Sequence, residues 1–239
     1  MRTGRAEDFI IYEDRDVIVC HKPAGLAVQS ARIGMPDMES MLKNYLAEKM
    51  PGKIPYLGII HRLDQPVEGA VVFAVNQRAA KELNSQLTTG KMKKTYLAVT
   101  EKRPAELSGE LEDWLKKDVR TNTSAVTSPG TPGAKKARLS YELAESLESE
   151  DSCRYLLRIA LETGRHHQIR VQMAHAGMPL AGDRKYNPEE TTDGSLALCS
   201  AGLTFIHPGK KKRMEICICP VNERFSGFSQ LGEDRVSFV

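Results

Sequence analysis

The longest uninterrupted run of apolar residues in this sequence is six residues long, from Ala70 to Val75. A run of that length can fill one buried β-strand, whereas a helix that crosses a bilayer needs about 18 apolar residues or more. The other apolar stretches are also short, and polar residues, Gly and Pro separate them. This pattern argues against a membrane-spanning chain and predicts a fold of many short strands and few helices.

Composition narrows the class of protein further. The 239 residues are 41% hydrophobic and 27% charged, which excludes collagen-like, coiled-coil and wholly disordered chains. This length fits one large domain or two small ones. No apolar stretch typical of a secretion signal follows the first residues, so we expect a cytoplasmic protein. The five cysteines form no C-x-x-C pair, and we expect them to be reduced.

The charge is slightly positive overall and unevenly distributed. The 34 basic and 31 acidic residues leave a net charge of +3, which is too small to indicate a polyanionic partner by itself. Acidic residues cluster at 142–151 and 189–190, and basic residues cluster at 91–94, 135–138, 165–170 and 210–213. The basic clusters could form one phosphate-facing surface, or they could be solvated loops that point in different directions.

Hydrophobic spacing and breaker residues predict most of the elements. In the first half they are a hairpin of Phe9–Tyr12 and Val17–Cys20, a helix at Met38–Met50 capped by Asp37, a strand at Gly69–Val75, a helix from the cap Asn76 to Gly90, and a strand at Lys93–Thr100. In the second half they are strands at Arg138–Ala144 and Tyr155–Leu161, a helix at Gln168–Ala176, and strands at Leu196–Ser200, Leu203–Ile206 and Met214–Cys219.

The order of these elements predicts the fold class. Consecutive strands joined by short turns favour antiparallel pairing, so we expect an α+β architecture around a central mixed, mainly antiparallel sheet. Thr121–Gly133 is rich in Thr, Ser, Pro and Gly, which is typical of a loop or arm rather than of a core segment.

Two segments concentrate side chains that could carry chemistry. His61–Pro66 (HRLDQP) places a histidine, an arginine and an aspartate directly before a buried strand, where rigid strands often hold catalytic loops. Thr163–Arg170 (TGRHHQIR) combines a Gly turn, a helix start and several donors, which suits a phosphate or a carboxylate. The alternative is that Asp64 caps a turn before Pro66 and that the histidines are hydrogen-bonded structural residues.

Missing motifs restrict the chemistry. The sequence contains no G-x-x-x-x-G-K-[ST], G-x-G-x-x-G or G-x-S-x-G, which disfavours nucleotide hydrolysis, dinucleotide redox chemistry and hydrolase-elbow chemistry. A zinc site of Cys217, Cys219 and His207 is a weaker alternative because the usual further ligand spacing is missing. Zinc bound by the histidines of residues 166–175 is also disfavoured, since no H-E-x-x-H motif is present.

Four segments of this chain occur in the same order in a known protein family. HRLDQPVEGAVVFA is similar to a signature HRLDxxTSGLLLLA, and LETGRHHQIRVQMAHAGMPLAGDRKY is similar to a TGR-x-HQIR segment with a trailing GD-x-x-Y. YEDRDVIVCHKPAGLAVQ resembles the opening strands of the same family, and KKTYLAVT resembles its K-x-Y-x-A-x-V strand. Spanning about residues 9 to 219, the four segments together resemble the RluA family of RNA pseudouridine synthases.

The resemblance implies a fold, an activity and three catalytic residues. The fold is pseudouridine synthase-like, with a catalytic cleft in a single catalytic domain over residues 1–239 and a loop or arm at 116–136. The activity is isomerisation of uridine to pseudouridine in RNA, without a cofactor or a metal. By position, Asp64 corresponds to the catalytic aspartate, Tyr96 to the tyrosine that packs against the target base, and Arg165 to the arginine that pairs with the aspartate.

The reaction accounts for these residue types. A carboxylate must stay ionised in a dry pocket to attack or deprotonate the nucleotide, and a guanidinium beside it offsets the desolvation. A tyrosine offers uracil a flat apolar face and a hydroxyl near C5. The target uridine must also leave its stack, which costs a few kcal/mol. Arg62, next to Asp64, is therefore expected to fill the vacated space or to hold a flanking phosphate.

The resemblance also implies the partners of the protein. The substrate is expected to be ribosomal RNA, transfer RNA or both, and the basic clusters are expected to contact its phosphates. We expect no DNA partner and no membrane partner, and we expect a monomer. The expected substrate-binding residues are His61, Arg62, Lys94, His167 and Arg170.

Two features depart from the family pattern and keep alternatives open. Val67-Glu68 stands where the family commonly has Thr-Ser, and a first strand that begins by Phe9 leaves no room for an S4-like RNA-binding domain. Site choice is therefore expected to come from the catalytic domain. The altered pair motivates a second hypothesis, a catalytically idle RNA-binding or RNA-folding protein. A third hypothesis is a metal-dependent hydrolase that uses His61, Asp64, His166 and His167.

Overall fold

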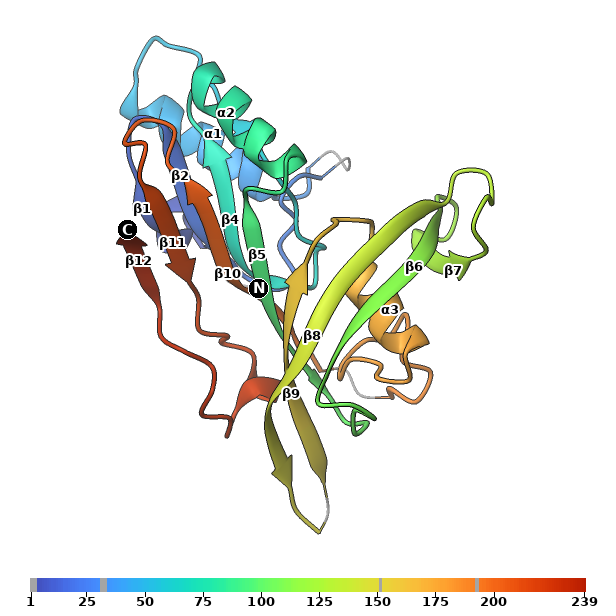
Figure 1. Ribbon diagram of the computed structural model, residues 1–239. Helices are drawn as coiled ribbons and strands as arrows, with labels where there is room; N and C mark the ends of the chain where they lie inside the picture. The colour runs from blue at the N-terminus through green and yellow to red at the C-terminus, as the bar shows by residue number, and fades with distance from the viewer. Residues whose placement is uncertain (1–3, 31–33, 151, 192–193) are drawn as a thin grey trace. The chain divides into compact units, whose positions relative to one another are not determined.

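The computed structural model describes residues 4–30, 34–150, 152–191 and 194–239, and the chain divides into two compact units (Figure 1). Unit 1 comprises Met1–Lys94, Ser200–Cys219 and Glu233–Val239, and unit 2 comprises Thr95–Cys199 and Pro220–Gly232. The chain crosses between the units four times, and two of these crossings lie inside strands. Strand β5 (Lys93–Thr100) begins in unit 1 and continues in unit 2, whereas β10 (Leu198–Ile206) begins in unit 2 and continues in unit 1.

Unit 1 is built around strand β4 (Glu68–Ala74), in which all seven residues are buried. The hairpin of β1 (Ile10–Glu13) and β2 (Val17–Lys22) pairs antiparallel with β4 through β2, with Lys22 opposite Gly69. The remaining strands are β3 (Gly58–Ile59), which pairs with β4, and β11 (Arg213–Cys217) and β12 (Arg235–Phe238), which extend from β10. A 3₁₀-helix, η1, spans Ala6–Phe9.

Two helices of unit 1 begin at residues whose side chains cap them. In α1 (Met38–Lys49) the Asp37 carboxylate accepts a hydrogen bond from the Ser40 backbone N–H, and in α2 (Gln77–Thr88) the Asn76 side chain accepts one from Ala79. These bonds satisfy N–H groups that lack a partner inside the helix. The two helices bury Met38, Leu42 and Leu46 from α1 and Ala79, Ala80, Leu83 and Gln86 from α2.

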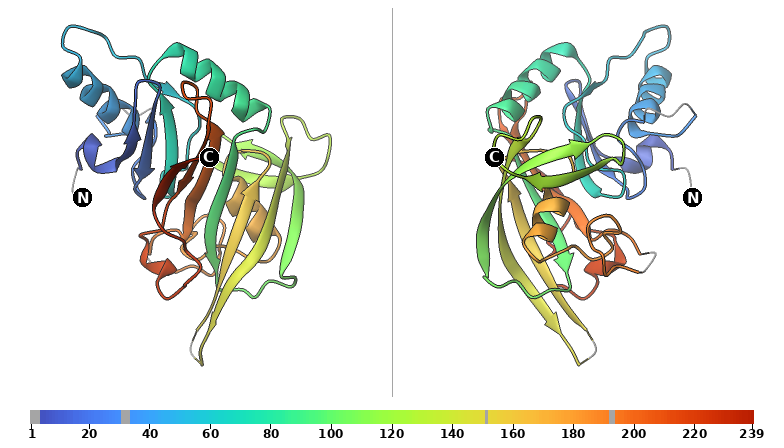
Figure 2. Two further views of the ribbon diagram at one scale, coloured as in Figure 1. Left: turned by 60° about the vertical axis from the view of Figure 1, so that its left-hand side comes forward. Right: turned by 90° about the vertical axis from the view of Figure 1, so that its right-hand side faces the viewer.

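Unit 2 contains a sheet in the order β5-β9-β8-β6-β7, and each neighbouring pair of these strands is antiparallel. Figures 1 and 2 show β8 and β9 as a long twisted hairpin. Helix α3 packs on β6 and β8, where Leu115, Ala137 and Val171 form a buried cluster. The bounds are β6 (Ser108–Asp118), β7 (Thr123–Thr127), β8 (Lys135–Glu148), β9 (Cys153–Leu161), α3 (Gln168–His175) and a 3₁₀-helix η2 (Glu223–Phe225).

Most predicted elements are confirmed, and two predictions are wrong. Residues 121–133 are not entirely loop, because β7 pairs with β6. The two strands predicted between residues 196 and 206 are one strand, since Gly202 lies within β10 opposite Cys217. Strands β3, β6 and β12 were not predicted. Asp151 and Met1–Thr3, which the charge and signal arguments used, lie outside the described residues.

None of the helices in the described ranges is long and apolar enough to cross a membrane. The pairing pattern agrees with the expected sheet: β2 pairs antiparallel with both β1 and β4, and one isolated bridge, between Ala27 and Asp37, is parallel.

Candidate functional site

Asp64 lies half-buried in the loop between β3 and β4, in a turn that is fixed from two sides. Its backbone oxygen accepts a hydrogen bond from Val67 N–H at 3.0 Å. The next residue, Gln65, is tied to Gly25: the Gln65 oxygen accepts from Gly25 N–H at 2.8 Å, and Gln65 Nε2 donates to Gly25 O at 2.9 Å. The loop that follows β2 therefore holds the turn that presents Asp64.

Lys22 joins these two loops from inside the protein. Its side chain is fully buried, and its Nζ donates to the backbone oxygens of Pro23 at 2.9 Å, Leu26 at 2.6 Å and Gln65 at 3.0 Å. An ammonium group has three N–H donors, so all of them are used. We call this arrangement the Lys22 clamp. It fixes the backbone of the residue that follows Asp64.

Burial makes the charge on Lys22 costly. It lowers the pKa of Lys22 from 10.5 to about 7, and the carboxylates of Asp64 and Glu68 oppose this effect. The same attraction favours the ionised form of Asp64, because a nearby cation stabilises a carboxylate. Lys22 was not among the site residues predicted from the sequence. Its signal in the sequence is a lysine that closely follows the apolar run Val17–Cys20 and directly precedes Pro23.

Glu68 opens the buried strand β4 and is only 2% exposed. Its Oε2 lies 3.8 Å from Nε2 of His21, which belongs to the neighbouring strand β2. Glu68 places a carboxylate where the family pattern commonly has a hydroxyl. In unit 1 it is a core residue, close enough to Lys22 to affect its titration.

The other unit 1 residues predicted to bind substrate have different environments. His61 is 8% exposed, its Nε2 accepts from Val72 N–H at 3.3 Å, and burial followed by the Lys94 charge lowers its pKa to about 3. It is therefore a neutral core residue. Arg62 is exposed to solvent, and Lys94 is half-buried, which lowers the pKa of Lys94.

Tyr96 and Arg165 belong to unit 2. Tyr96 is buried in β5, opposite Ile159 of β9. Arg165 is exposed, and its Nε donates to the backbone oxygen of Lys136 at 2.9 Å. The Gln168 side chain shapes this loop, because its Oε1 accepts from Arg165 N–H at 2.9 Å and from the hydroxyl of Thr163 at 2.7 Å. Gln168 was not predicted as a site residue, although it lies within the matched TGRHHQIR segment.

His167 is fixed within unit 2 as a neutral residue. It has a left-handed backbone conformation (φ 53°) directly before α3 and stacks on His166 with ring centroids 3.8 Å apart. Its Nδ1 lies 2.7 Å from the Tyr186 hydroxyl. Burial first, and then nearby cations such as Arg170, lower the pKa of His167 to about 2. Both histidine rings therefore act as packing and hydrogen-bonding groups.

Arg170 is buried and paired with Asp183. Its Nε and Nη2 donate to the two carboxylate oxygens at 2.8 and 2.7 Å, in the bidentate geometry that suits a guanidinium. The guanidinium carbon also lies 5.1 Å from the centre of the Tyr186 ring. This pair holds α3 to the segment that follows it. It gives Arg170 a structural partner in addition to any role toward substrate.

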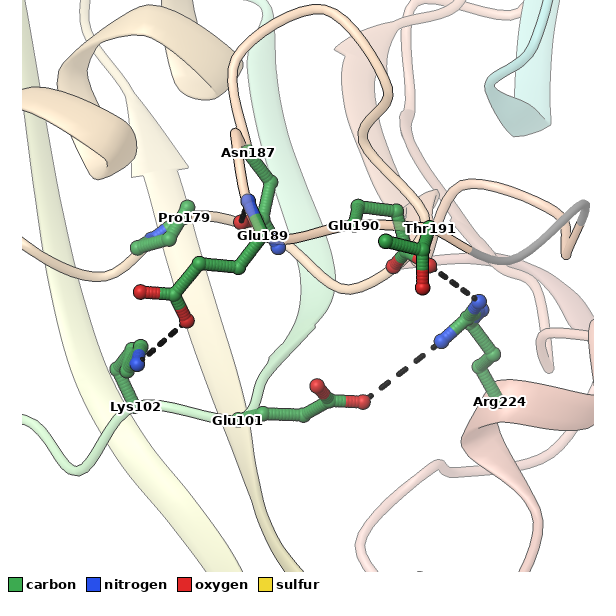
Figure 3. Close-up of a pocket in the computed structure, with 8 residues that line it drawn as sticks. All are labelled: Glu101, Lys102, Pro179, Asn187, Glu189, Glu190, Thr191 and Arg224. Carbon is green, nitrogen blue, oxygen red and sulfur yellow. Dashed lines mark hydrogen bonds and ion pairs between the residues drawn. The ribbon is translucent and has the colours of Figure 1, made fainter.

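A pocket in unit 2 contains none of the predicted site residues (Figure 3). Arg224 lies 3.7 Å from a Glu101 oxygen and 3.4 Å from a Glu190 oxygen, and Lys102 lies 2.7 Å from Glu189. Because the basic groups that line this pocket are paired with carboxylates, it is poorly suited to phosphate. The ion pair between Arg224 and Glu101 joins the segment after residue 220 to the end of β5.

The metal alternatives receive no support from side-chain positions. In the described parts of the chain, no group of three or more His, Cys, Asp and Glu side chains could hold a metal ion. His207 is fully buried, and its Nδ1 accepts from the backbone N–H groups of Gly209 and Lys210. Its Nε2 lies 3.0 Å from an Asp14 carboxylate oxygen. Both ring nitrogens of His207 are thus engaged within the protein.

The predicted site residues fall into two groups. Asp64, His61, Arg62 and Lys94 belong to unit 1, where the Lys22 clamp orders the loop. The residues contributed by unit 2 are Tyr96, Arg165, His167 and Arg170.

Comparison with known proteins gives one consistent result. A family model described as RNA pseudouridylate synthase matches residues 16–175. An uncharacterized RNA pseudouridine synthase of Bacillus subtilis, YlyB, is 31% identical over 202 residues, which are 83% of this chain and 64% of the relative. The ribosomal large subunit pseudouridine synthase D of Xylella fastidiosa is 32% identical over 230 residues, covering 90% of this chain and 66% of the relative. The chain thus spans just under two thirds of these curated relatives.

Solved structures agree on the fold. Human RNA Pseudouridylate Synthase Domain Containing 4 superposes with a TM-score of 0.74 at 19% identity, covering 89% of this chain and 88% of that chain. Human RNA Pseudouridylate Synthase Domain Containing 1 gives a TM-score of 0.71 at 22% identity, covering 91% of this chain and 86% of that chain. These likenesses confirm the α+β fold expected from the sequence.

Proposed function

Because the chain belongs to the RNA pseudouridylate synthase family, we propose that it isomerises uridine to pseudouridine in structured RNA. The observation that carries the proposal is the family match over residues 16–175, which include all of the predicted site residues. The name of the Xylella fastidiosa relative favours ribosomal RNA of the large subunit over transfer RNA as the substrate. The reaction breaks the N1–C1′ bond, turns the uracil and joins C5 to C1′.

In this proposal Asp64 attacks or deprotonates the nucleotide. The turn held by Gly25 and Lys22 supports this role, because a reacting group must keep one orientation. Tyr96 is proposed to pack on the base and to help remove the proton from C5. Arg165 is proposed to pair with Asp64. The resemblance carries these two roles. The exposed guanidinium of Arg165, held by its Nε, is compatible with a charged partner.

The predicted substrate contacts divide according to their surroundings. Arg62 and Lys94 are cations that could bind phosphate, since Arg62 is exposed and Lys94 is half-buried. We propose that His61, His167 and Arg170 act mainly by holding the loops in place, because each has a hydrogen-bond partner within its own unit.

Tritium release tests the proposed activity directly. RNA transcribed with 5-tritiated uridine should lose tritium to water when the purified protein is added, because C5 gives up its hydrogen as the new bond forms. Mapping of pseudouridine in the product would identify the site. RNA binding without tritium release would contradict the proposal and favour an idle RNA-binding protein. RNA cleavage that a chelator abolishes would favour a metal-dependent hydrolase.

Arg62→Ala should weaken RNA binding and modification. We expect the RNA concentration for half-maximal rate to rise about tenfold and the salt dependence of binding to become shallower by about one phosphate contact. The measurement is tritium release at several RNA and salt concentrations. Arg15→Ala is a matched control, because Arg15 is also an exposed arginine of unit 1 but lies outside the proposed site. An Arg62→Ala protein that binds and modifies RNA like the wild type would remove this role.

Lys22→Met should disorder the Asp64 turn while filling most of the same volume. The thioether chain cannot donate to the three backbone oxygens, and we expect the single-turnover rate to fall about 10²-fold because the reacting group is misplaced. Normal activity of Lys22→Met would show that the clamp does not position Asp64.

The pH dependence of stability gives a second readout for Lys22. Burial depresses the pKa of Lys22 to about 7, so between about pH 7 and pH 10.5 the unfolded chain binds this proton more readily than the folded chain. The Lys22 contribution to the free energy of unfolding therefore rises with pH across that window. Urea denaturation at several pH values should show this rise in the wild type and not in Lys22→Met.

A further inference from the structure

We propose that the β6–β7 hairpin and the adjoining start of β8 form an arm that binds the phosphate backbone of RNA through the face turned toward α3. This face carries Lys117, Lys135 and Lys185, which we call the hairpin patch. All three lysines are exposed, and among the described residues no carboxylate forms an ion pair with any of them. The identity of the bound strand as substrate RNA rests on the proposed function, whereas the cationic face does not.

The strand register places Lys117 and Lys135 on the same face of the sheet. Leu115 and Ala137 point toward α3, because they form a buried cluster with Val171 of that helix (Figure 1). Side chains alternate along a strand, so Lys117, two positions after Leu115, and Lys135, two positions before Ala137, point to the same side. Lys135 also lies opposite Leu115 in the pairing of β6 with β8. The two lysines therefore continue the α3-facing side beyond its buried part.

The opposite face of the same strands is balanced in charge. It carries Lys116 and Lys136, one position away from the patch lysines on β6 and β8. The carboxylate of Glu112 lies 2.6 Å from Lys136 Nζ and 2.8 Å from Arg138 Nε. Asp118 lies two positions from Lys116 and so shares its face. This side therefore offers a polyanion little net positive charge.

Two carboxylates on the α3 side are already bonded to other groups. Asp113 shares the face of Leu115, but its Oδ2 accepts from Gln172 Nε2 at 2.8 Å and its Oδ1 lies 3.1 Å from His175 Nδ1. Asp183 forms the buried bidentate pair with Arg170. Neither carboxylate forms an ion pair with a lysine of the hairpin patch. The positive charge of the patch is thus available to a ligand.

Side-chain hydrogen bonds hold the tip of the hairpin next to α3. His166 lies before this helix, with its Nδ1 2.9 Å from the Ser124 hydroxyl and its Nε2 3.1 Å from Asn122 Oδ1. From the segment after the helix, the Tyr186 hydroxyl accepts from Ser124 N–H at 2.8 Å, and Lys185 Nζ donates to the Asn122 oxygen at 2.9 Å. A tip that is fixed before binding loses less conformational entropy when a ligand binds.

The patch lies next to the loop that carries Arg165. Arg165 Nε donates to the backbone oxygen of Lys136, which directly follows Lys135. The charge of Lys117 also reaches this loop, because burial first, and then nearby cations that include Lys117, lower the pKa of His167. A strand bound along the patch would therefore continue past the loop that contains a predicted catalytic residue.

Protection of a sheet edge does not explain these lysines. Edge strands often carry lysine, which discourages pairing with another chain. The strand at this end of the sheet order is β7, whose sequence TSAVT contains no basic residue. Lys117 instead lies on β6, which pairs with strands on both sides, and Lys135 lies on β8. Their position is therefore better suited to binding than to edge protection.

The chemistry of the patch fits a phosphate backbone. An ammonium on a flexible chain binds phosphate as a point charge and reads no base sequence. Several such groups on neighbouring strands can neutralise successive phosphates of one nucleic acid strand, and each contact releases a counterion. We therefore expect the arm to hold RNA that flanks the target uridine rather than to select the uridine itself.

The test compares two double variants that remove the same charge from opposite faces of the same strands. Lys117→Gln/Lys135→Gln alters the hairpin patch, and Lys116→Gln/Lys136→Gln is the matched control. The probe is a fluorescein-labelled fragment of large-subunit ribosomal RNA, and its anisotropy gives the Kd. Near physiological salt we expect the Kd to rise about tenfold in the patch variant and less than about threefold in the control.

Salt dependence and rate separate binding from chemistry. The slope of log Kd against log salt should become shallower by about two phosphate contacts in the patch variant only. At saturating RNA, single-turnover tritium release by the patch variant should stay within about twofold of the wild type, because the patch binds RNA and does not react. Since all four lysines are exposed, the urea midpoints should be unchanged.

Chemical modification locates the bound RNA without a substitution. Bound RNA should protect Lys117 and Lys135 from acetylation, measured by mass spectrometry, and should leave Lys116 reactive. Equal protection of Lys116 and Lys117 would overturn the inference, because the RNA would then show no preference for the α3 face.

The outcomes distinguish this inference from the proposed activity. Equal Kd values and equal salt slopes for the two double variants would overturn the inference even if the protein is an active synthase. A wild-type protein that does not bind the RNA would also overturn it. Loss of binding confined to the patch variant, together with no tritium release by the wild type, would support the inference and contradict the proposed function.

Discussion

Replacing Asp64 by asparagine is expected to abolish pseudouridine formation. The amide has nearly the same shape as the carboxylate, but it can neither attack the nucleotide nor accept a proton from it. Loss of such a group typically lowers the rate by about 10³-fold or more, so tritium release in a single turnover should fall to background. The measurement uses enzyme in excess over RNA, so that slow product release does not mask the rate of the chemical step.

Binding and folding serve as controls for this variant. Asp64 is half-buried at the protein surface, and the turn is held by backbone and Gln65 bonds that asparagine does not remove. RNA affinity and the urea midpoint should therefore stay close to the wild-type values. Glu48→Gln, an equivalent amide substitution on the exposed side of α1, should keep full activity. An Asp64→Asn protein within about tenfold of the wild-type rate would rule out Asp64 as the reacting group.

The parts of the fold with strong local signals were predictable from the sequence. Asp37 and Asn76 precede helical hydrophobic patterns, and both side chains accept the capping hydrogen bonds that such residues typically accept. The alternating KKTYLAVT segment forms β5 with the predicted bounds. In these segments the local preference and the final packing agree, so the pattern alone is sufficient.

Strands that depend on distant partners were harder to predict. In β6 the charged residues of SGELEDWLKKD leave only Leu115 fully buried, and pairing with β7 and β8 is what defines the strand. The Thr- and Ser-rich segment around β7 lacks an apolar pattern, yet its backbone pairs with β6. Tertiary pairing overrides weak local preference in such cases.

The candidate site also contains residues that short motifs reveal and residues that only contacts between distant segments reveal. Asp64, Tyr96 and Arg165 were predicted as site residues because short motifs matched, whereas Lys22 was not predicted, because a single lysine at the end of a strand normally reaches solvent. Its role depends on three backbone oxygens, one of which comes from Gln65, far along the chain. His167 and Arg170 looked like substrate donors in sequence, but each is held by a hydrogen-bond partner in unit 2. Composition and spacing cannot report such pairings.

Gly69→Ala is expected to destabilise the fold strongly. Gly69 has φ of +119°, a conformation that residues with a side chain rarely adopt, and it lies inside the buried strand β4. An added Cβ would lie 2.6 Å from the backbone nitrogen of Ser200 and closer still to its carbonyl oxygen. Neither backbone can move easily, because Ser200 is itself in the buried part of β10.

We expect Gly69→Ala to lower the free energy of unfolding by about 4 kcal/mol or more, which combines backbone strain with a steric clash. Gly90→Ala separates the two effects. Gly90 also has a positive φ, of +69°, but an added Cβ there would meet nothing within 4 Å. Its cost should therefore be only about 1 kcal/mol, from conformation alone. Urea denaturation of both variants gives the comparison. Equal losses of unfolding free energy in the two variants would mean that Gly69 is needed for its backbone conformation alone. The close approach of β4 to Ser200 would then not explain why this position is a glycine.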